Sequence, residues 1–296
     1  MPNAQSTLTV LTSPAWEDYE LLDSGNGLKL ERYGPNLLVR PEPQAMWSPA
    51  LGEDVWKSAH ATFQPTHEES GGHWQTNRSM PSEWQMRYGG LTFIARLTAG
   101  RHLGVFPEQA CHWDWTADLI ERSDRPIQVL NLFGYTGLAT LAAALAGARV
   151  THIDASKKSV SWARENQALS ALDTRPIRWI VEDALKFVER EGRRGVRYDG
   201  IILDPPKFGR GPKGEVWEFF DLFPRLMAAC LKILGAQPLF LAVTAYAIRA
   251  SALSLHNNLS GMTGGLGGQV TAGELALRES SAGRLVSTAI FARWQA

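Results

Sequence analysis

The sequence predicts an α/β fold built on a mostly parallel sheet, and three observations carry that prediction. Short apolar runs alternate with helix-like stretches from about residue 105 to residue 260, as in repeated βαβ units. A glycine-containing turn over residues 131–137 follows the first of these runs. The last segments, Val270 to Leu277 and Leu285 to Trp294, alternate in polarity and flank Ser280 to Gly283. They predict an antiparallel hairpin at the end of the sheet.

The elements of the α/β part follow from these runs in order. Strands are expected over residues 128–132, 149–153, 177–181, 200–203 and 239–243. Helices are expected over residues 138–146, 157–169, 184–191, 216–234 and 248–259. With the closing hairpin, the predicted sheet has seven strands and is covered by helices on both faces. This is a Rossmann-like, doubly wound arrangement.

The first hundred residues lack this alternation of strands and helices. We expect roughly the first 20 residues, which carry Ser, Thr, Pro and acidic side chains, to form a loose start. Short strand-like segments lie between Tyr19 and Arg40 and again at Leu91 to Leu97, whereas residues 41–82 show no clear pattern. The sequence therefore predicts two domains, a small β-rich region over residues 1–105 and an α/β domain over residues 106–296.

Composition narrows the class of protein. Apolar residues make up 44% of the 296 residues, and 30 basic side chains balance 30 acidic ones. This balance argues against a protein that grips nucleic acid mainly by charge, although a local basic patch is still compatible with it. Cys111 and Cys230 form no zinc-site or disulfide spacing, and no metal site is expected. Met1 to Val10 does not read as a signal peptide, no segment reads as a membrane span, and a cytoplasmic location is expected.

Polar residues follow three of the predicted parallel strands, at the edge where ligands bind to such sheets. The turn Asn131 to Gly137 can pass close to a ligand, although a tight connection is an equal alternative. Asp154 can accept both hydroxyls of a ribose, or cap the next helix, or do both. Glu182 and Asp183 can accept from an adenine amino group or act as a helix cap. Because the spacings of dinucleotide and P-loop motifs are missing, these features suit an adenosine ligand.

The segment Asp204 to Phe208 (Asp-Pro-Pro-Lys-Phe) follows the apolar strand at residues 200–203. Consecutive prolines end the strand and stiffen the loop, because they fix φ and donate no N–H. The Asp204 carboxylate and the backbone carbonyls then act as acceptors for a planar nitrogen base, on which the Phe208 ring can stack. The alternative, a Pro-Pro pair that only closes a strand, is less favoured here.

These motifs, in this order and spacing, resemble class I S-adenosylmethionine (SAM)-dependent methyltransferases. More narrowly, the chain resembles the bacterial 23S ribosomal RNA methyltransferases that modify cytosine C5 or guanine N7. The resemblance covers roughly residues 88–296, whereas residues 1–87 match no module of that family. The segments that carry it are Gly90 to Leu97, Gly104 to Gln109, Asn131 to Gly137, Asp154 to Ser156, Ala163 to Asn166 and Tyr198 to Phe208.

The resemblance implies a Rossmann-like class I methyltransferase domain, SAM as cofactor and RNA, with ribosomal RNA favoured, as substrate. A methyl group on a sulfonium is already a strong electrophile, so no metal is expected. The methyl acceptor would lie at Asp204, Pro205, Pro206, Lys207 and Phe208. The cofactor would contact Phe106, Pro107, Glu108, Gln109, Asn131, Phe133, Gly134, Tyr135, Thr136, Gly137, Asp154, Ala155, Ser156, Asn166, Asp183, Ala184 and Asp204.

Two positions depart from the family pattern. The cytosine-C5 members carry a cysteine in a T-F-S-C-S stretch, which is matched here by Ala242 to Tyr246 with alanine at position 245. Since cytosine-C5 methylation needs a thiolate that attacks the ring, this substitution argues against that reaction. The arginine of the family's D-x-R motif is replaced by Ala110. The acceptor atom is therefore left open.

Other side chains have a functional and a structural interpretation. Lys207 can steer an anionic substrate or be simply solvated. The basic residues that can contact RNA, or form solvated loops, are Arg193, Arg194, Arg197, Arg210 and Lys213. His102 and His112 flank the proposed cofactor segment. Either can serve as a general base, but a hydrogen-bonded structural role is the favoured interpretation. Four tryptophans can stack on bases but are better explained as small-domain core, namely Trp47, Trp56, Trp74 and Trp84.

Three functions follow from these interpretations. We favour an RNA base methyltransferase that works without a catalytic cysteine. A methyltransferase for a protein side chain or a small molecule is the alternative, consistent with the zero net charge and the missing arginine. A non-catalytic SAM-binding module is the third, and the intact Asp-Pro-Pro-Lys-Phe segment argues against it.

Overall fold

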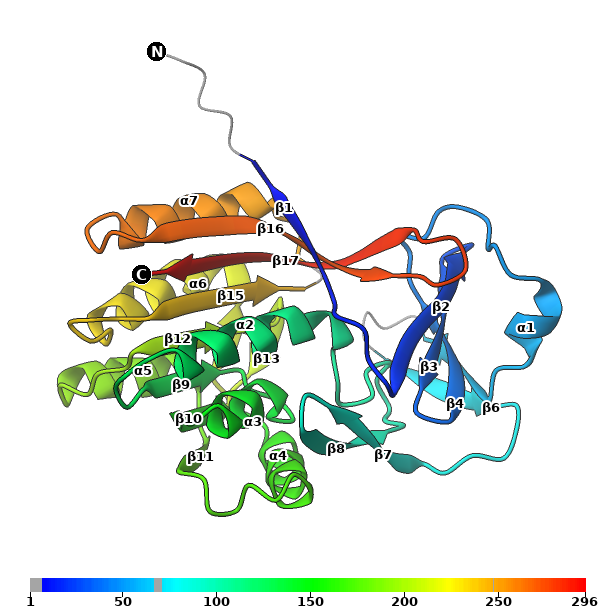
Figure 1. Cartoon of the computed structure of the whole chain (residues 1–296), viewed down its shortest axis with the longest axis horizontal. Helices are drawn as coiled ribbons and strands as arrows, with labels where there is room; N and C mark the ends of the chain where they lie inside the picture. The colour runs from blue at the N-terminus through cyan, green and yellow to red at the C-terminus, as the bar shows by residue number, and fades with distance from the viewer. Residues whose placement is uncertain (1–6, 67–70, 247) are drawn as a thin grey trace, which may run out of the picture.

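A computed structural model describes residues 7–66, 71–246 and 248–296 of the chain, with an α/β part and a smaller β-rich part side by side (Figure 1). The α/β part contains an eight-stranded sheet with the strand order β1-β16-β17-β15-β12-β9-β10-β11. Its strands are β1 (Thr9–Thr12), β9 (Gln128–Leu132), β10 (Arg149–Asp154), β11 (Ile177–Val181), β12 (Gly200–Leu203), β15 (Phe240–Ala245), β16 (Gln269–Arg278) and β17 (Leu285–Gln295).

The predicted architecture of the sheet is confirmed. Strands β9, β10, β11, β12 and β15 are parallel, and β17 runs antiparallel to both β15 and β16. These are the seven expected strands, including the C-terminal hairpin. Since all five parallel strands end at the same edge, the polar residues that follow them are gathered there.

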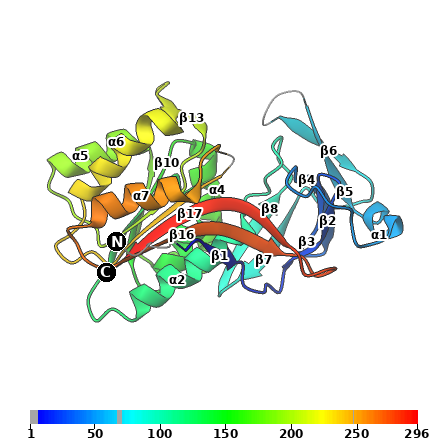
Figure 2. The same ribbon diagram turned by 90° about the horizontal axis from the view of Figure 1, so that it is seen from above.

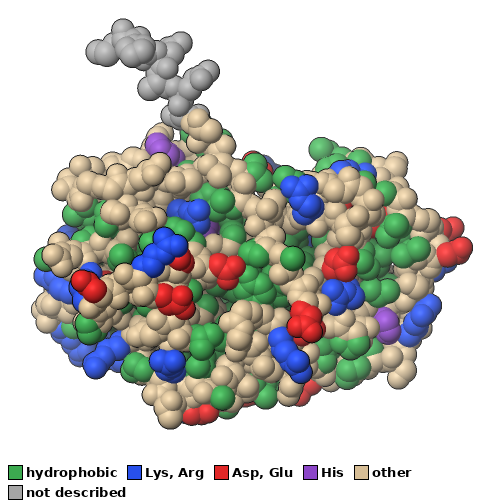
Figure 3. Space-filling model, in the orientation of Figure 1, with side chains coloured by type: hydrophobic (Ala, Val, Ile, Leu, Met, Phe, Trp, Pro, Cys, Tyr) green, Lys and Arg blue, Asp and Glu red, His purple; other side chains and the backbone are tan. Residues whose placement is uncertain are grey.

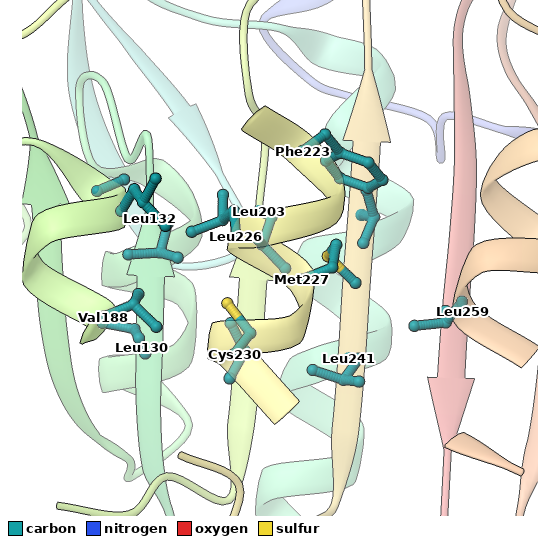
Figure 4. Close-up of a cluster of buried hydrophobic side chains, with 14 of the residues drawn as sticks. Leu130, Leu132, Val188, Leu203, Phe223, Leu226, Met227, Cys230, Leu241 and Leu259 are labelled. Atoms are coloured by element: carbon teal, nitrogen blue, oxygen red, sulfur yellow. The ribbon is translucent and has the colours of Figure 1, made fainter. Parts of the chain in front are cut away.

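Helices cover both faces of this sheet. They are α2 (Ala110–Glu121), α3 (Leu138–Leu145), α4 (Lys157–Leu169), α5 (Ala184–Arg193), α6 (Phe219–Lys232) and α7 (Ala252–Thr263). Figure 2 shows α5, α6 and α7 on one face and α2 on the other. On the α6 side, Leu226, Met227 and Cys230 pack against Leu203 and Leu241 of the sheet (Figure 4). Cys230 is therefore a core residue, as its apolar surroundings in the sequence predict.

The N-terminal region is rich in β structure, as predicted. One sheet contains β2 (Tyr19–Gly25), β3 (Leu28–Tyr33), β4 (Asn36–Pro41), β5 (Ala61–Pro65) and β6 (Gly72–Thr76). A separate hairpin consists of β7 (Glu83–Tyr88) and β8 (Leu91–Arg96), and the short helix α1 (Glu53–Lys57) lies beside the larger sheet. The described residues between 41 and 82, where the sequence shows no clear pattern, thus hold α1, β5 and β6.

Two local predictions are wrong. The expected loose start contains β1, which pairs in parallel with β16 and adds an eighth strand to the sheet; residues 1–6 lie outside the described residues. The helix expected over 216–234 begins only at Phe219, because Val216–Glu218 forms strand β14. Strand β14 pairs with β13 (Phe208–Arg210) in a small antiparallel flap next to the Asp-Pro-Pro segment. Helix α2 (Ala110–Glu121) is not predicted by the sequence pattern.

The β-rich region and the α/β part share a hydrophobic cluster. Tyr19 and Tyr33 of the N-terminal sheet belong to the same buried cluster as Leu141 of α3 and Leu277 of β16. Since the two parts share this buried cluster, their boundary is not marked by a separate core. The domain boundary near residue 105 stays a prediction. In the described part of the chain, no helix is long and apolar enough to cross a membrane.

The tip of the β16–β17 hairpin reaches into the β-rich region (Figure 1). Glu279, fully buried at this tip, accepts a hydrogen bond of 2.5 Å from the Ser24 hydroxyl and pairs with the guanidinium of Arg284. Arg284 also bonds Asp23, at 3.3 Å. The hairpin and β2 are therefore joined by a buried polar cluster whose two carboxylates share one cation.

We expect the Arg284→Met variant to be less stable by about 2–3 kcal/mol, because two buried carboxylates lose their cation while the arginine is itself partly exposed. Urea unfolding at pH 7 measures this loss. Arg278→Met on the same hairpin is the matched control, since the Arg278 side chain is exposed and, within the described residues, bonds the Gly283 carbonyl; it should lose less than about 0.5 kcal/mol. Equal losses in the two variants would contradict the role of this cluster.

Candidate active site

A pocket of about 510 Å³, partly open to solvent, lies where β9, β12 and β15 end. Its wall combines the segment before α2, the turn after β9, and the first residues of α2 and α3. Eight of the residues predicted from the sequence line it, namely Phe106, Gln109, Asn131, Phe133, Gly134, Tyr135, Thr136 and Asp204. The structure thus brings the flanking segment, the glycine turn and the Asp-Pro-Pro segment together.

The turn from Asn131 to Gly137 has an unusual backbone. Phe133 and Tyr135 adopt left-handed conformations, with φ of +58° and +49°, and Gly137 has φ of +85°. A side chain at Gly134 would collide with the buried ring of His152, and a Cβ at Gly137 would lie 2.8 Å from that of Ala163. Both glycines are thus required by close packing, and strain of this kind is concentrated at functional sites.

Two predicted cofactor residues anchor the turn from below. The Thr136 hydroxyl, which is 2% exposed, donates to the Gly104 carbonyl at 2.5 Å. The fully buried Asn166 side chain donates to the Thr136 carbonyl at 3.0 Å and accepts from the Ile94 amide at 2.9 Å. Asn166 does not line the pocket, so its role in this structure is to hold the turn rather than to touch a ligand.

Asp154, at the end of β10, supports the same turn. Its two carboxylate oxygens accept hydrogen bonds of 2.8 Å from the amides of Tyr135 and Ser156. Burial raises the pKa of this carboxyl. The cap of α4 is Ser156, whose hydroxyl accepts from the Ser159 amide at 3.2 Å. Asp154 does not line the described pocket, so the use of its remaining lone pairs for ribose hydroxyls stays a prediction.

The acidic pair after β11 lies away from the described pocket wall. Asp183 caps α5 by accepting from the Lys186 amide at 2.9 Å, and Glu182 pairs with Arg190. Ala184, the next residue, is buried at the start of α5. The structural alternative for Asp183 is therefore realised, and contact of this pair with an adenine amino group stays a prediction.

A buried histidine that the sequence analysis did not single out supports the turn. His152, on β10, lies 2.9 Å from the Thr140 hydroxyl, which in turn accepts from the Asn131 amide at 2.9 Å. Burial lowers the pKa of His152 to about 3, so its ring is neutral at physiological pH. In the sequence, the glycine at position 134 is the feature that reflects the space taken by the His152 ring. That connection can be recognised only once the two residues are seen together in the structure.

Asp204 follows β12 directly and is held by an amide rather than by a cation. The Gln109 side chain donates to Asp204 at 3.2 Å and accepts from the Thr244 hydroxyl at 3.2 Å. Burial, reinforced by the nearby carboxylate of Glu108, raises the pKa of Asp204 to about 7. The pKa of Glu108 is itself raised by burial. Such perturbed carboxyls in a pocket mark a candidate catalytic site.

The prolines and the flap are fixed to each other. The indole N–H of Trp217 donates to the Pro206 carbonyl at 2.7 Å, and its ring lies 4.9 Å from that of Phe133. The amide of Phe219 bonds the Lys207 carbonyl at 3.0 Å. Trp217, which the sequence analysis missed, therefore couples the Asp-Pro-Pro segment to the glycine turn.

The flap exposes an aromatic ring near the pocket. Phe208, the first residue of β13, is 51% exposed, and the guanidinium of Arg210 lies 6.0 Å from its ring centre. Phe208 does not line the described pocket, so stacking on a bound base stays a prediction. Proteins that bind single-stranded nucleic acids nevertheless often use an exposed aromatic ring beside a cationic side chain.

The structure separates the basic residues proposed for RNA contact. Arg210 and Lys213 lie on or beside the flap, at the carboxyl edge of the sheet. The exposed residues Arg193, Arg194 and Arg197 lie between the end of α5 and the start of β12. In a βαβ unit that connection is at the opposite edge of the sheet. Only the first pair can take part in a site at the pocket.

Neither cysteine can act as a nucleophile. Ala245 occupies the family's cysteine position and is buried at the end of β15. Burial raises the pKa of Cys111 to about 12, and burial in the core raises that of Cys230 still further. A thiolate is thus unavailable near neutral pH. Neither Cys111 nor Cys230 is among the residues that line the pocket, so neither is placed as a nucleophile for a reaction there.

Fold and site together define a class: a Rossmann-like protein with a ligand pocket at the carboxyl edge of its parallel strands. Comparison with known proteins agrees. The sequence model of the S-adenosylmethionine-dependent methyltransferase family matches residues 45–243, and the chain belongs to that family. It is an enzyme that uses SAM as cofactor.

Solved structures confirm the whole fold. The chain is 49% identical to a SAM-dependent methyltransferase from Agrobacterium tumefaciens, with a TM-score of 0.94 over 98% of this chain and 94% of that one. SMU.776, a methyltransferase solved in complex with SAH, has a TM-score of 0.72 at 20% identity, over 94% of this chain and 75% of its own. The second likeness supports the fold alone.

Curated relatives share only part of the chain. A Ribosomal RNA large subunit methyltransferase K/L from Shewanella sp. (strain ANA-3) is 34% identical over 135 residues, which are 45% of this chain and 18% of that protein. The same enzyme from Shewanella baltica (strain OS195) is 32% identical over 150 residues, 49% and 20% of the two chains. The chain thus spans about a fifth of the length of these relatives.

The residues present fit SAM in chemical terms. The pocket has apolar walls from Leu138, Ala139 and Ile202 beside the acceptors and donors of Gln109 and Asp204. Asp154 lies at the turn with acceptors suited to a ribose. The pocket therefore offers apolar surface together with a few convergent polar groups, as small-molecule sites do.

The pKa of Asp204 makes a pH dependence testable. If the ionised carboxylate is the active form, kcat/KM should rise with pH through about 7 and be about tenfold lower at pH 6 than on the plateau above pH 8. Glu108→Gln removes a like charge, so the midpoint should move to lower pH. Initial rates with labelled SAM measure both profiles. An unchanged midpoint in Glu108→Gln would contradict this electrostatic coupling.

Proposed function

We propose that this enzyme methylates a base in RNA, with ribosomal RNA as the favoured substrate, and that it does so without a catalytic cysteine. One observation carries the proposal. The buried carboxylate of Asp204, followed by two prolines, stands in the wall of the pocket where SAM is expected. That geometry presents hydrogen-bond acceptors to a planar nitrogenous group.

The relatives support RNA as the substrate class. The two Shewanella relatives, which match this chain over nearly half its length, are named as methyltransferases of large-subunit ribosomal RNA. Ribosomal RNA is made in the bacterial cytoplasm, where we place the reaction. The family model begins at residue 45 and so includes part of the N-terminal region, which sequence comparison with the ribosomal RNA methyltransferases did not match. We infer that this region helps to orient the substrate.

The chain's residues supply orientation and charge rather than a nucleophile. When bound, SAM supplies a methyl group on a sulfonium, ready for in-line transfer. We assign Asp204 to hold an N–H of the acceptor base and to stabilise the positive charge that develops on it. Gln109 fixes the Asp204 carboxylate, and Trp217 fixes the loop that follows.

The charge distribution favours a short contact with RNA rather than a long one. On the face shown in Figure 3, basic and acidic side chains are interspersed, and the whole chain has no net charge. The flap carries Arg210 and Lys213 as well as the acidic Glu215 and Glu218. We assign its residues Phe208, Arg210 and Lys213 to the nucleotides next to the acceptor. Such a base must be unstacked or single-stranded to reach Asp204.

Transfer of label tests the substrate class. We expect the enzyme with labelled SAM to label total RNA from cells lacking the gene, and to leave protein extract and metabolites unlabelled. Digestion to nucleosides then identifies the modified base. Asp204→Ala should still bind SAM and lose about 100-fold or more in transfer rate, whereas the variant Asp221→Asn, which changes an exposed carboxylate on α6, should match the wild type.

Label in protein or metabolites alone would replace RNA by another acceptor class. Full activity of Asp204→Ala would remove the proposed acceptor site. SAM binding without label in any fraction would indicate a binding module rather than an enzyme for these substrates.

Matched charge changes test the flap. In the double variant Arg210→Gln/Lys213→Gln, KM for RNA should rise about tenfold, and the dependence of KM on salt should weaken by about two counterions. Arg193→Gln/Arg194→Gln removes the same charge at the opposite edge of the sheet and should leave KM unchanged. Rates with labelled SAM at several salt concentrations measure this difference. Equal effects of the two variants would show that RNA does not bind at the flap.

A further inference from the structure

A second pocket adjoins the candidate cofactor pocket on the side of the β-rich region. It measures about 360 Å³ together with its open mouth, and its inner part has room for only a small polar group. Residues of β3 and β4 form one wall, and the segment before α2 and the end of β15 form another. Val105 and Phe106 line both pockets. A substrate group placed here would therefore lie next to the expected cofactor, at the junction of the two parts of the chain.

The ring of Phe106 stands between the two pockets. Its centre lies 5.8 Å from that of Tyr135 in the cofactor pocket and 4.8 Å from that of His102 in the second pocket. Tyr246 adds a third ring to this second pocket, 5.6 Å from His102 and 6.5 Å from Phe106. The Arg101 guanidinium donates to the Tyr246 hydroxyl and lies 5.3 Å from the ring centre. Partly exposed rings beside a guanidinium form a surface on which a planar base can stack.

His102 has unused hydrogen-bonding capacity in the second pocket. It is partly exposed, and no described residue hydrogen-bonds its ring nitrogens. Unlike the ring nitrogens of His112, they are not fully buried, so they keep accessible surface. Burial of the ring, together with the positive charge of Arg40, lowers the pKa of His102 to about 3. The neutral ring therefore offers one N–H donor and one acceptor nitrogen to a ligand.

The charges around this pocket favour a neutral polar group over an ion. Burial raises the pKa of the Tyr246 hydroxyl, on which the positive charge of Arg101 and the negative charges of Glu42 and Glu108 act in opposite directions. The Lys29 ammonium, on β3, lies 3.7 Å from the Glu42 carboxylate. Since cations and carboxylates are mixed around the pocket, neither a phosphate nor an ammonium group is favoured. The edge of a base, with an N–H beside an acceptor, meets partners of both kinds.

We propose that this second pocket recognises the acceptor base, with His102 hydrogen-bonding the edge of the base and the Arg101–Tyr246 pair stacking on its face. This inference rests on the proposed RNA substrate. The charge of Glu108 acts on Asp204, which places the two carboxyls near each other. A base that enters the pocket therefore lies beside the carboxyl to which we assign its reactive N–H. The N-terminal sheet, which supplies one wall, then takes part in choosing the base.

Steady-state kinetics with labelled SAM and total RNA from cells lacking the gene test the role of His102. In His102→Phe, kcat/KM for RNA should fall about tenfold, whereas the affinity for S-adenosylhomocysteine (SAH), measured by calorimetry, should change less than about threefold. His102→Gln keeps a donor and an acceptor and should recover part of the loss. His256→Phe makes the same change on α7, outside both pockets, and should match the wild type in both measurements.

A second pair of variants tests the stacking surface. Tyr246→Phe keeps the ring and should retain kcat/KM for RNA within about threefold, whereas Tyr246→Leu removes the ring and should lose about 5- to 100-fold. Because Tyr246 is partly exposed, both variants should fold. Their SAH affinities and melting temperatures, compared with those of the wild type, verify this.

The outcomes distinguish this inference from the proposed function. Full kcat/KM of either His102→Phe or Tyr246→Leu, in an assay where the wild type labels RNA, would overturn the role of the pocket and leave RNA standing as the substrate. An equal loss of SAH affinity in these variants would place the pocket in cofactor binding and would overturn the inference as well. If the wild type labels no RNA, the proposed function fails, and this inference fails with it.

Discussion

The side chain of Asn166 joins three segments on which the active site depends. It accepts from the Ile94 amide in β8 and donates to the Thr136 carbonyl, and the Thr136 hydroxyl donates to Gly104 ahead of α2. One buried amide on α4 thus fixes the N-terminal hairpin, the glycine turn and the flanking segment relative to one another. Because the turn holds left-handed, non-glycine residues, it needs such over-determined support. The pocket is preorganised by these contacts.

The described contact that holds the Asp204 carboxyl in this frame comes from a neutral amide, that of Gln109. An arginine beside it would hold the pKa of the carboxyl low and occupy its oxygens. The structure places the neutral amide of Gln109 there instead, and keeps the negative charge of Glu108 nearby. Burial and a like charge then raise the pKa of Asp204 to about 7. The carboxyl keeps acceptor capacity for a substrate, and with a pKa of about 7 it is mostly ionised only above neutral pH.

Sequence reasoning recovered the features that depend on local pattern. The parallel strands, the closing hairpin and α4 follow from periodicity, and the turn, Asp154 and Asp204 stand where strands end. Sequence reasoning failed where a contact between distant segments determines the local structure. Strand β1 has four residues and exists only by pairing with β16, and β14 interrupts a helical pattern because Trp217 bonds Pro206. The same limit hid the roles of His152 and Asn166, since a buried partner cannot be read from spacing.

The N-terminal region contributes to the site through the segment before α2. The Ser13 hydroxyl donates to the Pro107 carbonyl at 2.7 Å, and the Arg40 guanidinium donates to the Arg101 carbonyl at 3.0 Å. Thr136 holds Gly104 from the other side. Residues 101–107 are therefore clamped between the β-rich region and the glycine turn, with Phe106 facing the pocket. Since Gln109 follows at once, a displacement of the N-terminal region would move the side chain that holds Asp204. The β-rich region is in this sense part of the active-site scaffold, whatever further contact it makes with the substrate.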